Sequence, residues 1–477
     1  MYKYNFNKTK IVATIGPATS SKEMLTQLIK AGVDVCRINS SHGTHIDHLQ
    51  VIKNIREINK ELNSDICILQ DLQGPKLRIG IVENDEVFIE KGKKIILTCN
   101  EMIGNSEMIT IRYIDLAKDV KPGELILLDD GKLELRIDRV INNTDVEATV
   151  IEGGSLKSKK GFNLPHTDMS FPSLTEKDLL DLDFALENNV EWIGLSFVRK
   201  AEDIIDLKRR IAEKGKDCRV IAKIEKPEAV MNIDEIIAVT DAVMVARGDL
   251  GVEMPLQDLP IIQKNIIEKC IKSAKPVIVA TQMMESMIYN STPTRAEVSD
   301  VANAVIDGAD AVMLSAETSV GAFPIKVVET MEKIVRDVEK DRRVYFKGTK
   351  PTSESDTFVS DEICFTAVRM SDHLKAKSIV GMTRSGYSAL EISSYRPKAD
   401  IYIFTNNEVL LKAMSLVWGV RGFYYNDYVS TDQTFTDVIE VLKKNQLVKD
   451  GDIVVHTASM PIHKKSMANS IKISVVD

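Results

Sequence analysis

Eight short apolar runs, each followed by a helical pattern, recur along this 477-residue chain up to about residue 340. The runs are rich in β-branched residues and almost continuously apolar, which is typical of parallel strands covered on both faces. They are residues 10–16, 33–39, 66–72, 191–198, 219–225, 241–250, 276–282 and 310–317. Eight strand–helix units in series predict an α/β fold, a closed (β/α)8 TIM barrel; a doubly wound open sheet is the weaker alternative.

The helical patterns between these runs carry start and stop signals. Residues 21–32 begin with Ser-x-Glu and end with glycine, and residues 174–189 begin at Thr175, a favourable N-cap. Helices with defined ends between successive strands are what the crossover units of a barrel require.

One interval breaks this alternation. From about residue 74 to residue 165 the chain shows short alternating strands and almost no helical pattern. Gly153, Gly154 and the basic stretch 155–161 are interpreted as the return hinge of an insertion. We therefore expect a catalytic barrel of residues 1–73 and 166–345, with an inserted β-barrel lid domain of residues 74–165 over its mouth.

A polar linker, residues 347–356, follows the last barrel helix. Helical and strand patterns then alternate again, which predicts a C-terminal α/β domain of residues 355–477. The expected helices are 361–375, 386–394 and 408–418, and the expected strands are 377–383, 400–406, 453–459 and 471–476.

Composition excludes several classes of protein. The 62 lysines and arginines against 70 aspartates and glutamates give a net charge of −8, which argues against nucleic-acid binding. Six scattered cysteines without a CxxC pair favour reduced thiols over disulfides or zinc ligands. The N-terminus lacks an apolar signal segment and no run is long enough to span a bilayer, so we expect a cytoplasmic protein without membrane contacts.

Residues at the carboxyl ends of barrel strands are the catalytic candidates in this fold. Polar groups follow every predicted strand from the second to the eighth, which core packing does not explain. They are Arg37, Asn39, Ser41, His42, Asp71, Ser196, Arg199, Lys223, Glu225, Arg247, Gly248, Asp249, Thr281, Gln282, Ser315 and Glu317.

Two carboxylates in this set, Glu225 and Asp249, follow neighbouring strands and suit one hard divalent cation such as Mg²⁺, which keeps waters and shares substrate phosphates. Lys223 precedes Glu225 by two residues, so both side chains lie on one face of a strand. A lysine beside a metal-bound carboxylate suits a phosphoryl group whose charge spreads in the transition state. A simple ion pair between Lys223 and Glu225 is the alternative.

Two further features indicate anion binding. Arg37 beside Asn39 and Ser41 is typical of an anion clamp, because the guanidinium fork matches phosphate. The backbone N–H groups of residues 248–251, Gly-Asp-Leu-Gly, can cradle a carboxylate, although a plain tight turn accounts for this stretch equally well.

Several stretches resemble the motifs of the pyruvate kinase family. They are CRINSSHG (36–43), KIEKPEAV (223–230), MVARGDLGVE (244–253), VIVATQMMESM (277–287) and the long PTRAEVSDVANAVIDGADAVMLSAETSVGAFP (293–324). The likeness extends over the barrel, the insert and the C-terminal domain. It implies transfer of the phosphoryl group of phosphoenolpyruvate to ADP, which gives pyruvate and ATP in the last step of glycolysis.

The resemblance also implies roles for residues around the metal. Lys223 matches the lysine that stabilises the transferring phosphoryl group and the developing enolate. Glu225 and Asp249 match the ligands of Mg²⁺ (or Mn²⁺), and Arg37 matches a phosphate-binding arginine.

Further substrate contacts follow from the same resemblance. The amides of Gly248 and Asp249 should hold the carboxylate of phosphoenolpyruvate, with Ser196 nearby. Thr281 matches the threonine beside the methylene carbon that is protonated, and either this residue or a water chain donates the proton.

Nucleotide contacts are implied for residues on two sides of the barrel mouth. They are Asn39, Ser40, Ser41, His42, Arg78 and Lys160. Asp130 matches an acidic residue of the lid that approaches the active-site arginines when the lid closes and excludes water.

In the C-terminal domain, MTRSGYSA (382–389) resembles the effector loop of the family, and a helix-start turn is an equally good interpretation. The loop residues are Thr383, Arg384, Ser385, Gly386 and Ser388. The second effector segment of the family corresponds to residues 459–473, which lack its usual glycine. We therefore expect an altered phosphorylated effector or none, with Lys464 and Lys465 as further phosphate partners, in a homotetramer.

The stretch DLQGPKLRIG (71–80) departs from the commoner family version at four positions, Leu72, Gln73, Lys76 and Ile79. The commoner version accompanies a K⁺ requirement, with the ion held by groups that match Asn39, Ser41, Asp71 and the carbonyl of residue 72. The four departures together are associated with members that do not need K⁺. The Lys76 ammonium would supply the monovalent charge from within the chain, so we expect no K⁺ requirement; a lone surface lysine is the alternative.

Two other function classes are weaker. A Mg²⁺-dependent barrel lyase or mutase would share the carboxylate pair but would have no use for the lid, for Lys160 or for the 293–324 stretch. A non-catalytic sensor would tolerate loss of Lys223 or Thr281, and both are present.

Overall fold

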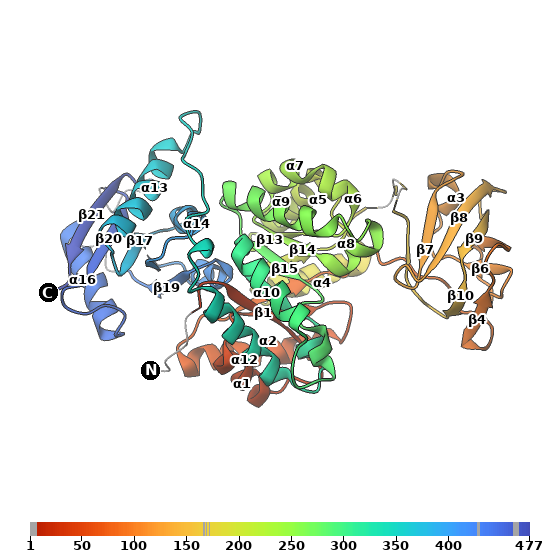
Figure 1. Cartoon of the computed structure of the whole chain (residues 1–477), viewed down its shortest axis with the longest axis horizontal. Coiled ribbons are helices and arrows are strands. Elements are labelled where there is room, and N and C mark those ends of the chain that lie inside the picture. Colours follow the sequence, from red (N-terminus) through yellow and green to blue (C-terminus); the bar gives the residue numbers. More distant parts are fainter. Residues whose placement is uncertain (1–6, 166, 168, 171, 427–429, 461–466) are drawn as a thin grey trace.

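Three bodies lie in a row along the molecule, with the C-terminal domain at one end, the barrel in the middle and the insert at the other end (Figure 1). The computed structural model describes residues 7–165, 167, 169–170, 172–426, 430–460 and 467–477. In this described part of the chain, no helix is both long and apolar enough to cross a membrane.

Eight parallel strands close into a barrel in the order β1-β16-β15-β14-β13-β12-β3-β2. They are β1 (Lys10–Ile15), β2 (Val35–Asn39), β3 (Cys67–Asp71), β12 (Trp192–Leu195), β13 (Arg219–Ile224), β14 (Ala242–Ala246), β15 (Val277–Ala280) and β16 (Ala311–Leu314). Closure confirms the predicted (β/α)8 fold and excludes the open sheet, because every strand has a neighbour on both sides.

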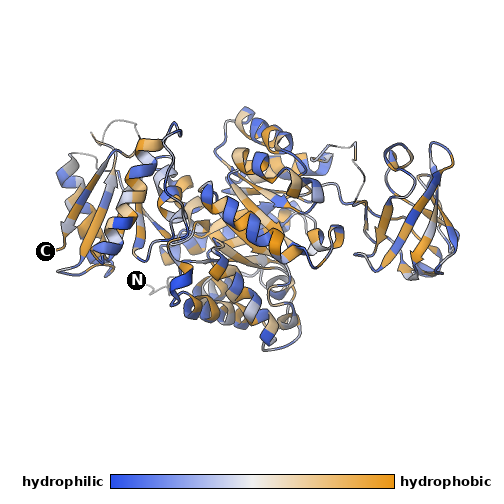
Figure 2. Cartoon of the chain, turned by 45° about the horizontal axis from the view of Figure 1, so that its top comes forward, coloured by the Kyte–Doolittle hydropathy of each residue, from blue (hydrophilic) through white to orange (hydrophobic). Residues whose placement is uncertain are grey.

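Helices cover the outside of this barrel. They are α1 (Lys22–Ala31), α2 (His45–Leu62), α4 (Glu176–Glu187), α5 (Ala201–Glu213), α6 (Pro227–Met231), α7 (Ile233–Val239), α8 (Arg247–Glu253), α9 (Leu259–Lys272), α10 (Arg295–Asp307), α11 (Ala316–Ser319) and α12 (Pro324–Val338). The predicted N-cap of α4 is confirmed, since the Thr175 side chain accepts the N–H of Asp178. Figure 2 shows the strands mainly in the hydrophobic colour, whereas the surrounding helices alternate between hydrophobic and hydrophilic residues.

Several strands end earlier than the sequence pattern predicts, among them β12, which stops at Leu195 instead of residue 198. β14 stops at Ala246, and residues 247–250, which we expected to continue the strand, begin helix α8. β16 stops at Leu314, and helix α11 begins at Ala316. A buried apolar run looks the same in a strand and in a short buried helix, so hydrophobicity does not mark the switch between them.

The C-terminal domain covers the amino ends of the barrel strands. Trp192, the first residue of β12, donates its indole N–H to the carbonyl of Ala413 (3.1 Å). Arg396 is 2% exposed and pairs at 2.7 Å with Asp310, which directly precedes β16. These contacts close one end of the barrel and leave the carboxyl ends of the strands, which face the insert, as the open end.

The insert between β3 and β12 is built from two sheets, β10-β4 and β11-β7-β8-β9-β5-β6. Its elements are β4 (Glu86–Ile89), β5 (Lys94–Thr98), β6 (Met108–Thr110), α3 (Leu116–Asp119), β7 (Leu125–Leu128), β8 (Leu133–Val140), β9 (Asp145–Glu152), β10 (Gly154–Lys157) and β11 (Phe162–Asn163). The sheets enclose a hydrophobic core of their own, so the insert packs as a separate body.

The C-terminal domain is a five-stranded sheet in the order β19-β18-β17-β20-β21, antiparallel only at β21, with helices around it. Its elements are α13 (Phe358–His373), β17 (Ser378–Met382), α14 (Tyr387–Ser394), β18 (Asp400–Thr405), α15 (Glu408–Ala413), β19 (Val420–Tyr424), α16 (Thr431–Lys444), β20 (Ile453–Ala458) and β21 (Ser470–Val475). Strand β19 and helix α16 were not expected, and the helix expected at 408–418 is α15 followed by a 3-10 turn, Met414–Leu416.

His456 on β20 is fully buried against Phe435, with ring centroids 4.8 Å apart, and neither of its ring nitrogens has a hydrogen-bond partner among the described residues. Burial, aided by Lys472, lowers its pKa from 6.5 to about 4. Below pH 6.5 the unfolded chain therefore binds a proton that the folded chain does not bind, and acidification favours unfolding.

We predict that His456→Leu removes this acid sensitivity. Urea unfolding between pH 7 and pH 4 should show the unmodified protein losing up to about 3 kcal/mol through this residue, and the variant losing correspondingly less. His373→Leu, a change at an exposed histidine, is the control and should keep the slope of the unmodified protein. Equal slopes for His456→Leu and the unmodified protein would contradict the prediction.

Candidate active site

Asp71, the last residue of β3, is the centre of a polar cluster at the open end of the barrel. Its side chain is 1% exposed; Oδ2 accepts the Arg37 Nε–H at 2.7 Å and Oδ1 lies 3.1 Å from the Lys223 ammonium. Burial alone would raise the pKa of Asp71, but Lys223 and Arg37 outweigh it and hold that pKa below its usual value. The carboxylate is therefore ionised and holds two cations at once.

The ion pair between Lys223 and Asp71 crosses β12, which lies between β13 and β3 in the barrel. The residue of β12 in register with Asp71 is Gly194. A Cβ atom at position 194 would lie only 3.0 Å from Asp71 Oδ1. Glycine therefore leaves the space in which the lysine and the aspartate meet, a requirement that sequence reasoning did not identify.

Lys223 has three close polar partners. Its Nζ lies 2.9 Å from Glu225 Oε1 and donates to Ser196 Oγ at 2.7 Å, in addition to its contact with Asp71. The Ser196 hydroxyl donates in turn to the carbonyl of Leu72 (2.7 Å). Burial lowers the pKa of Lys223, but Asp71 and Glu225 more than compensate, so that pKa lies above its usual value. The ammonium is thus charged, and its ion pair with Glu225 is only part of a larger cluster.

Glu225 and Asp249 approach each other as their positions after neighbouring strands predict, because β13 pairs with β14. Glu225 is 1% exposed, and its Oε2 accepts the backbone N–H of Phe197 at 2.7 Å. Burial raises the pKa of Glu225 to about 7, Asp249 adds to this rise, and Lys223 opposes it. Two carboxylates are therefore held together at a cost in charge repulsion.

A divalent cation fits this pair, because it would relieve the repulsion between the two carboxylates. Among the described residues, no group of three or more histidine, cysteine, aspartate or glutamate side chains is arranged to hold a metal. A cation at Glu225 and Asp249 would therefore complete its shell with water or substrate oxygens, as Mg²⁺ commonly does.

Thr281 directly follows β15, and its Oγ1 accepts the backbone N–H of Gly248 at 2.6 Å. Gly248 and Asp249 lie in the first turn of α8. The structure thus brings the predicted threonine and the predicted glycine–aspartate pair to the same part of the barrel rim.

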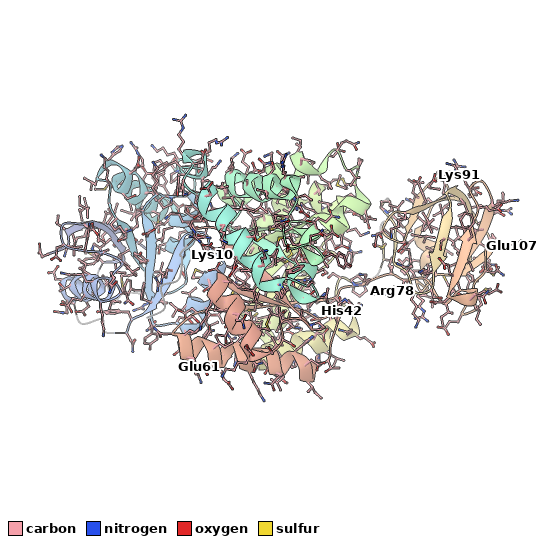
Figure 3. The ribbon with its side chains drawn as sticks, turned by 60° about the horizontal axis from the view of Figure 1, so that its bottom comes forward. Lys10, His42, Glu61, Arg78, Lys91 and Glu107 are labelled. Carbon is pink, nitrogen blue, oxygen red and sulfur yellow. The ribbon has the colours of Figure 1, made fainter. Side chains whose placement is uncertain are left out.

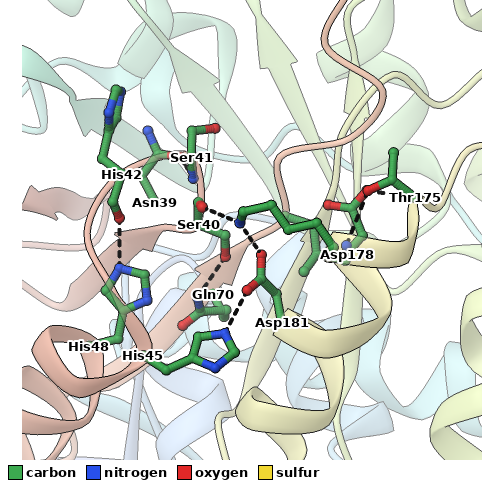
Figure 4. A network of polar contacts seen from close by, with 12 residues as sticks. Asn39, Ser40, Ser41, His42, His45, His48, Gln70, Thr175, Asp178 and Asp181 are labelled. Carbon is green, nitrogen blue, oxygen red and sulfur yellow. Dashed lines mark hydrogen bonds and ion pairs between the residues drawn. The ribbon is translucent and has the colours of Figure 1, made fainter.

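The loop after β2 is held rigidly at Ser40 (Figure 4). Its N–H donates to the Asp71 carbonyl (2.9 Å), and its hydroxyl accepts the side-chain amide N–H of buried Gln70 (2.7 Å). Next to it, Asn39 Oδ1 accepts the N–H of Ser41 at 3.1 Å. These contacts fix the backbone from which residues 39–42 project.

Lys177, Asp181 and His45 form a chain of contacts beside this loop, and Figure 4 labels Asp181 and His45. Lys177 on α4 donates to the Ser40 carbonyl and to Asp181, both at 2.6 Å. Asp181 in turn lies 2.7 Å from Nε2 of His45, whose ring stacks on Phe184. The only sequence signal was the i, i+4 spacing of Lys177 and Asp181 on a predicted helix, which is common on solvated helix faces.

In the insert, the predicted nucleotide contacts form a second group. Arg78 donates to the carbonyl of Lys159 at 3.1 Å, and Lys160 pairs with Asp129 at 2.7 Å. Figure 3 places His42 at the end of the barrel that faces the insert and Arg78 at the neck between the two bodies. His42 and Arg78, one from each group of candidates, thus lie where the barrel and the insert face each other.

Lys76 is exposed and lines a pocket between barrel and insert together with Asp130, Arg199 and Asp249. Among the described residues, no hydrogen bond or ion pair joins its ammonium to Asn39, Ser41 or Asp71, the groups that match the K⁺ ligands of the family. Leu72 and Ile79, two of the residues that accompany Lys76 in the sequence, are buried at 1% and 0% exposure.

Two other strand-end candidates make structural contacts. Glu317 accepts the backbone N–H groups of Ser315 (2.7 Å) and Met284 (3.3 Å). Arg199 donates to the carbonyl of Met169 (2.6 Å), a residue of the segment that returns from the insert.

The candidate effector loop joins β17 to α14. The Gly386 N–H donates to Thr383 Oγ1 at 2.9 Å, and Gly386 has a φ of +87°, so the loop has the geometry of a helix-start turn. Arg219, the first residue of β13, donates to the carbonyl of Ser385 (3.0 Å). Arg384 and Ser388 lie in the same turn, whereas Lys464 and Lys465 lie outside the described residues.

Comparison with known proteins assigns the chain to one family throughout. Residues 6–328 match the family model "Pyruvate kinase, barrel domain", and residues 361–474 match "Pyruvate kinase, alpha/beta domain". Pyruvate kinase 2 of Synechocystis is 44% identical over 472 residues, which are 98% of this chain and 79% of that one. The pyruvate kinase of Clostridium perfringens is 40% identical over 98% of this chain and 100% of its own length. The crystal structure of a pyruvate kinase from Cryptosporidium parvum superposes with a TM-score of 0.92 at 34% identity, covering 99% of this chain and 96% of that one.

We predict that Glu225 and Asp249 bind a divalent cation before any substrate arrives. Glu225→Gln should weaken Mn²⁺ binding at least about tenfold, because one of two charged ligands is lost. Titration of the free Mn²⁺ signal by electron paramagnetic resonance measures this directly. Glu285→Gln changes an exposed carboxylate after β15 and should bind Mn²⁺ like the unmodified protein. Unchanged binding by Glu225→Gln would show that the ion lies elsewhere.

Proposed function

The chain belongs to the pyruvate kinase family and is a phosphotransferase that makes pyruvate and ATP from phosphoenolpyruvate and ADP, and we propose that it does so with Mg²⁺ (or Mn²⁺) at Glu225 and Asp249 and without K⁺. The observation that carries this proposal is the cluster around Asp71, which pairs with the Arg37 guanidinium and the Lys223 ammonium and holds both cations at the open end of the barrel.

Phosphoryl transfer needs little covalent chemistry from the protein and depends on positioning and charge neutralisation. The bound metal would neutralise charge on the phosphoryl oxygens. Lys223, charged and anchored to Asp71 and Ser196, would stabilise the transferring group and then the enolate oxygen. Asp71 and Thr14 orient the Arg37 guanidinium, whose remaining N–H groups can bind a phosphate.

The substrate carboxylate would bind at the start of α8. The amides of Gly248 and Asp249 are the donors proposed for it, and the Gly248 N–H now donates to Thr281 Oγ1. A bound carboxylate would compete for this N–H and leave the threonine hydroxyl beside the methylene carbon. Either Thr281 or a water chain then supplies the proton that converts the enolate to pyruvate.

The nucleotide would bind in the gap between the barrel and the insert. Residues 39–42 present a fixed backbone on the barrel side, and Arg78 and Lys160 provide positive charge on the other side. The ion pair of Lys160 with Asp129 is partly exposed and therefore weak, so a phosphate can replace the aspartate at small cost. Closure of the insert, with Asp130 approaching the site, would exclude water from the phosphoryl group.

Independence from K⁺ is supported by the oxygen groups that would otherwise bind the ion. Asn39 Oδ1 accepts the N–H of Ser41, the Asp71 carboxylate contacts Arg37 and Lys223, and the carbonyl of residue 72 accepts a hydroxyl. Donors or cations of the chain thus already contact Asn39, Asp71 and the carbonyl of residue 72. Lys76, on its flexible stem in the pocket beside Asp249, would add the monovalent charge when substrates bind.

Other properties follow from the family and belong to the same proposal. The chain would form a homotetramer in the cytoplasm and would bind no nucleic acid. A phosphorylated effector, if one acts, would bind at Thr383, Arg384, Ser385, Gly386 and Ser388, from which Arg219 gives a direct contact to barrel strand β13. The family assignment covers the barrel, the insert and the C-terminal domain, and it therefore argues against a barrel lyase or mutase and against a non-catalytic sensor.

We predict full activity in buffer whose only monovalent cation is Na⁺ or tetramethylammonium. Pyruvate formation from phosphoenolpyruvate should depend on ADP and Mg²⁺, and adding K⁺ should change the rate less than about twofold, because the chain supplies the charge itself. Lys76→Glu should lose activity at least about tenfold and regain part of it with K⁺.

Lys93→Glu makes the same charge change at an exposed position of the insert and serves as the control, with activity like that of the unmodified protein. Strong K⁺ activation of the unmodified protein would refute independence from K⁺ while leaving the phosphotransferase assignment intact. Absence of ADP-dependent pyruvate under every cation condition would refute the proposed reaction itself.

A further inference from the structure

The backbone after β15 adopts a conformation that its residues disfavour. Thr281 and Gln282 are consecutive non-glycine residues with φ values of +68° and +54°. The left-handed region is a genuine outlier for a β-branched residue such as threonine, because its Cβ substituents crowd the backbone there. Strain of this kind persists only where surrounding contacts enforce it, and it concentrates at functional sites.

The contact that enforces this conformation comes from Arg247. Its guanidinium donates twice to the carbonyl oxygen of Thr281, from one terminal nitrogen at 2.7 Å and from Nε at 3.3 Å. The peptide group between Thr281 and Gln282 is thus clamped at its oxygen by a planar donor fork.

Arg247 is itself held by two outer helices. On α10, Asp300 Oδ1 accepts a hydrogen bond from one terminal nitrogen at 2.8 Å and Oδ2 lies 2.7 Å from the other, while Gln263 on α9 contributes a longer contact of 3.5 Å. The Arg247 side chain is 14% exposed and the Asp300 side chain is 35% exposed, so this pairing is partly shielded from solvent. The bidentate carboxylate fixes the plane of the guanidinium and therefore the direction of its bonds to Thr281.

The residue after Arg247 holds the other polar group of Thr281. The Gly248 N–H donates to Thr281 Oγ1 at 2.6 Å, and this hydroxyl donates in turn to the Ala280 carbonyl at 2.6 Å. Residues 247 and 248 therefore hold Thr281 at its carbonyl and at its hydroxyl. Release of the carbonyl would let the backbone relax toward β or right-handed helical geometry and would swing Oγ1 away from its place.

We propose that Arg247 and Asp300 are positioning residues that keep the Thr281 hydroxyl aimed at the substrate carbon by holding its backbone in the left-handed conformation. This inference rests on the proposed function, in which Thr281 stands beside the carbon that is protonated. Neither residue touches the substrate; both act through Thr281. A purely structural tie between α8 and α10 is the competing explanation of the same ion pair.

The test measures the proton-transfer half of the reaction separately. In the reverse direction the enzyme removes a proton from the pyruvate methyl group to give the enolate, which then takes up a deuteron from D2O. Loss of the methyl proton signal in the presence of ATP and Mg²⁺, followed by nuclear magnetic resonance, gives the exchange rate. The variants are Arg247→Lys, Asp300→Asn, Thr281→Val and the double variant Arg247→Lys with Thr281→Val.

Arg247→Lys keeps the charge but cannot form the fork, and Asp300→Asn keeps the shape but weakens the hold on the arginine. Both should lower the exchange rate and kcat about 10- to 100-fold, with the KM for phosphoenolpyruvate and for ADP within about threefold. Thr281→Val should lower the exchange rate at least as much, and the double variant should be no slower than Thr281→Val alone. Arg209→Met removes an exposed arginine of α5 and is the control for the loss of a surface ion pair.

Exchange by Arg247→Lys within about twofold of the unmodified rate, with exchange lost in Thr281→Val, would overturn the positioning role and leave the proposed role of Thr281 intact. Unchanged exchange in Thr281→Val would overturn both. A double variant slower than either single variant by the product of their effects would show that Arg247 acts independently of Thr281, which also overturns the proposal. If Arg247→Lys proves unstable in a melting experiment, Asp300→Asn decides by the same criteria.

Discussion

The arrangement of the site depends on one buried carboxylate that binds two cations. Asp71 lies between the guanidinium of Arg37 and the ammonium of Lys223 with almost no solvent access. A buried charge without partners is costly, and removal of one member of a buried pair typically costs about 3–5 kcal/mol. The three side chains therefore hold one another in place before any substrate binds, and Lys223 in turn orders Glu225 and Ser196.

The strand order β13-β12-β3-β2 brings these three groups together. Arg37 and Asp71 lie on adjacent strands β2 and β3, but Lys223 reaches Asp71 across β12, where Gly194 leaves the necessary space. The C-terminal domain closes the opposite end of the barrel through Trp192 and Arg396, so the carboxyl ends of the strands remain as the open end. The insert faces that end of the barrel.

Much of this arrangement could be predicted from the sequence, because some signals are local. Apolar runs marked all eight barrel strands, and the rule that catalytic groups follow barrel strands selected Asp71, Lys223, Glu225 and Thr281. The predicted start of α4 at Thr175 was confirmed because an N-cap acts through its own next residues.

The rest depends on contacts between distant residues, which a single sequence does not show. The left-handed backbone at Thr281 is enforced by Arg247, 34 positions away, and no local pattern indicates it. Lys177 donates to the carbonyl of Ser40, which lies 137 positions earlier in the chain. The spacing of Lys177 and Asp181 is one that is common on exposed helix surfaces, so it did not indicate this contact. The prediction that β14 continues to residue 250 was wrong for a related reason. A short segment that is buried on all sides has the same apolar pattern whether it is strand or helix.

The charge of Asp71 is the property on which the proposed site most directly depends. Asp71→Asn keeps the size of the side chain and removes the charge that holds Arg37 and Lys223, and a melting experiment establishes that the variant is folded. ADP-dependent pyruvate formation from phosphoenolpyruvate, measured at saturating Mg²⁺, should then fall at least about 100-fold in kcat. A folded Asp71→Asn protein that turns over within about twofold of the unmodified enzyme would show that catalysis does not depend on this carboxylate.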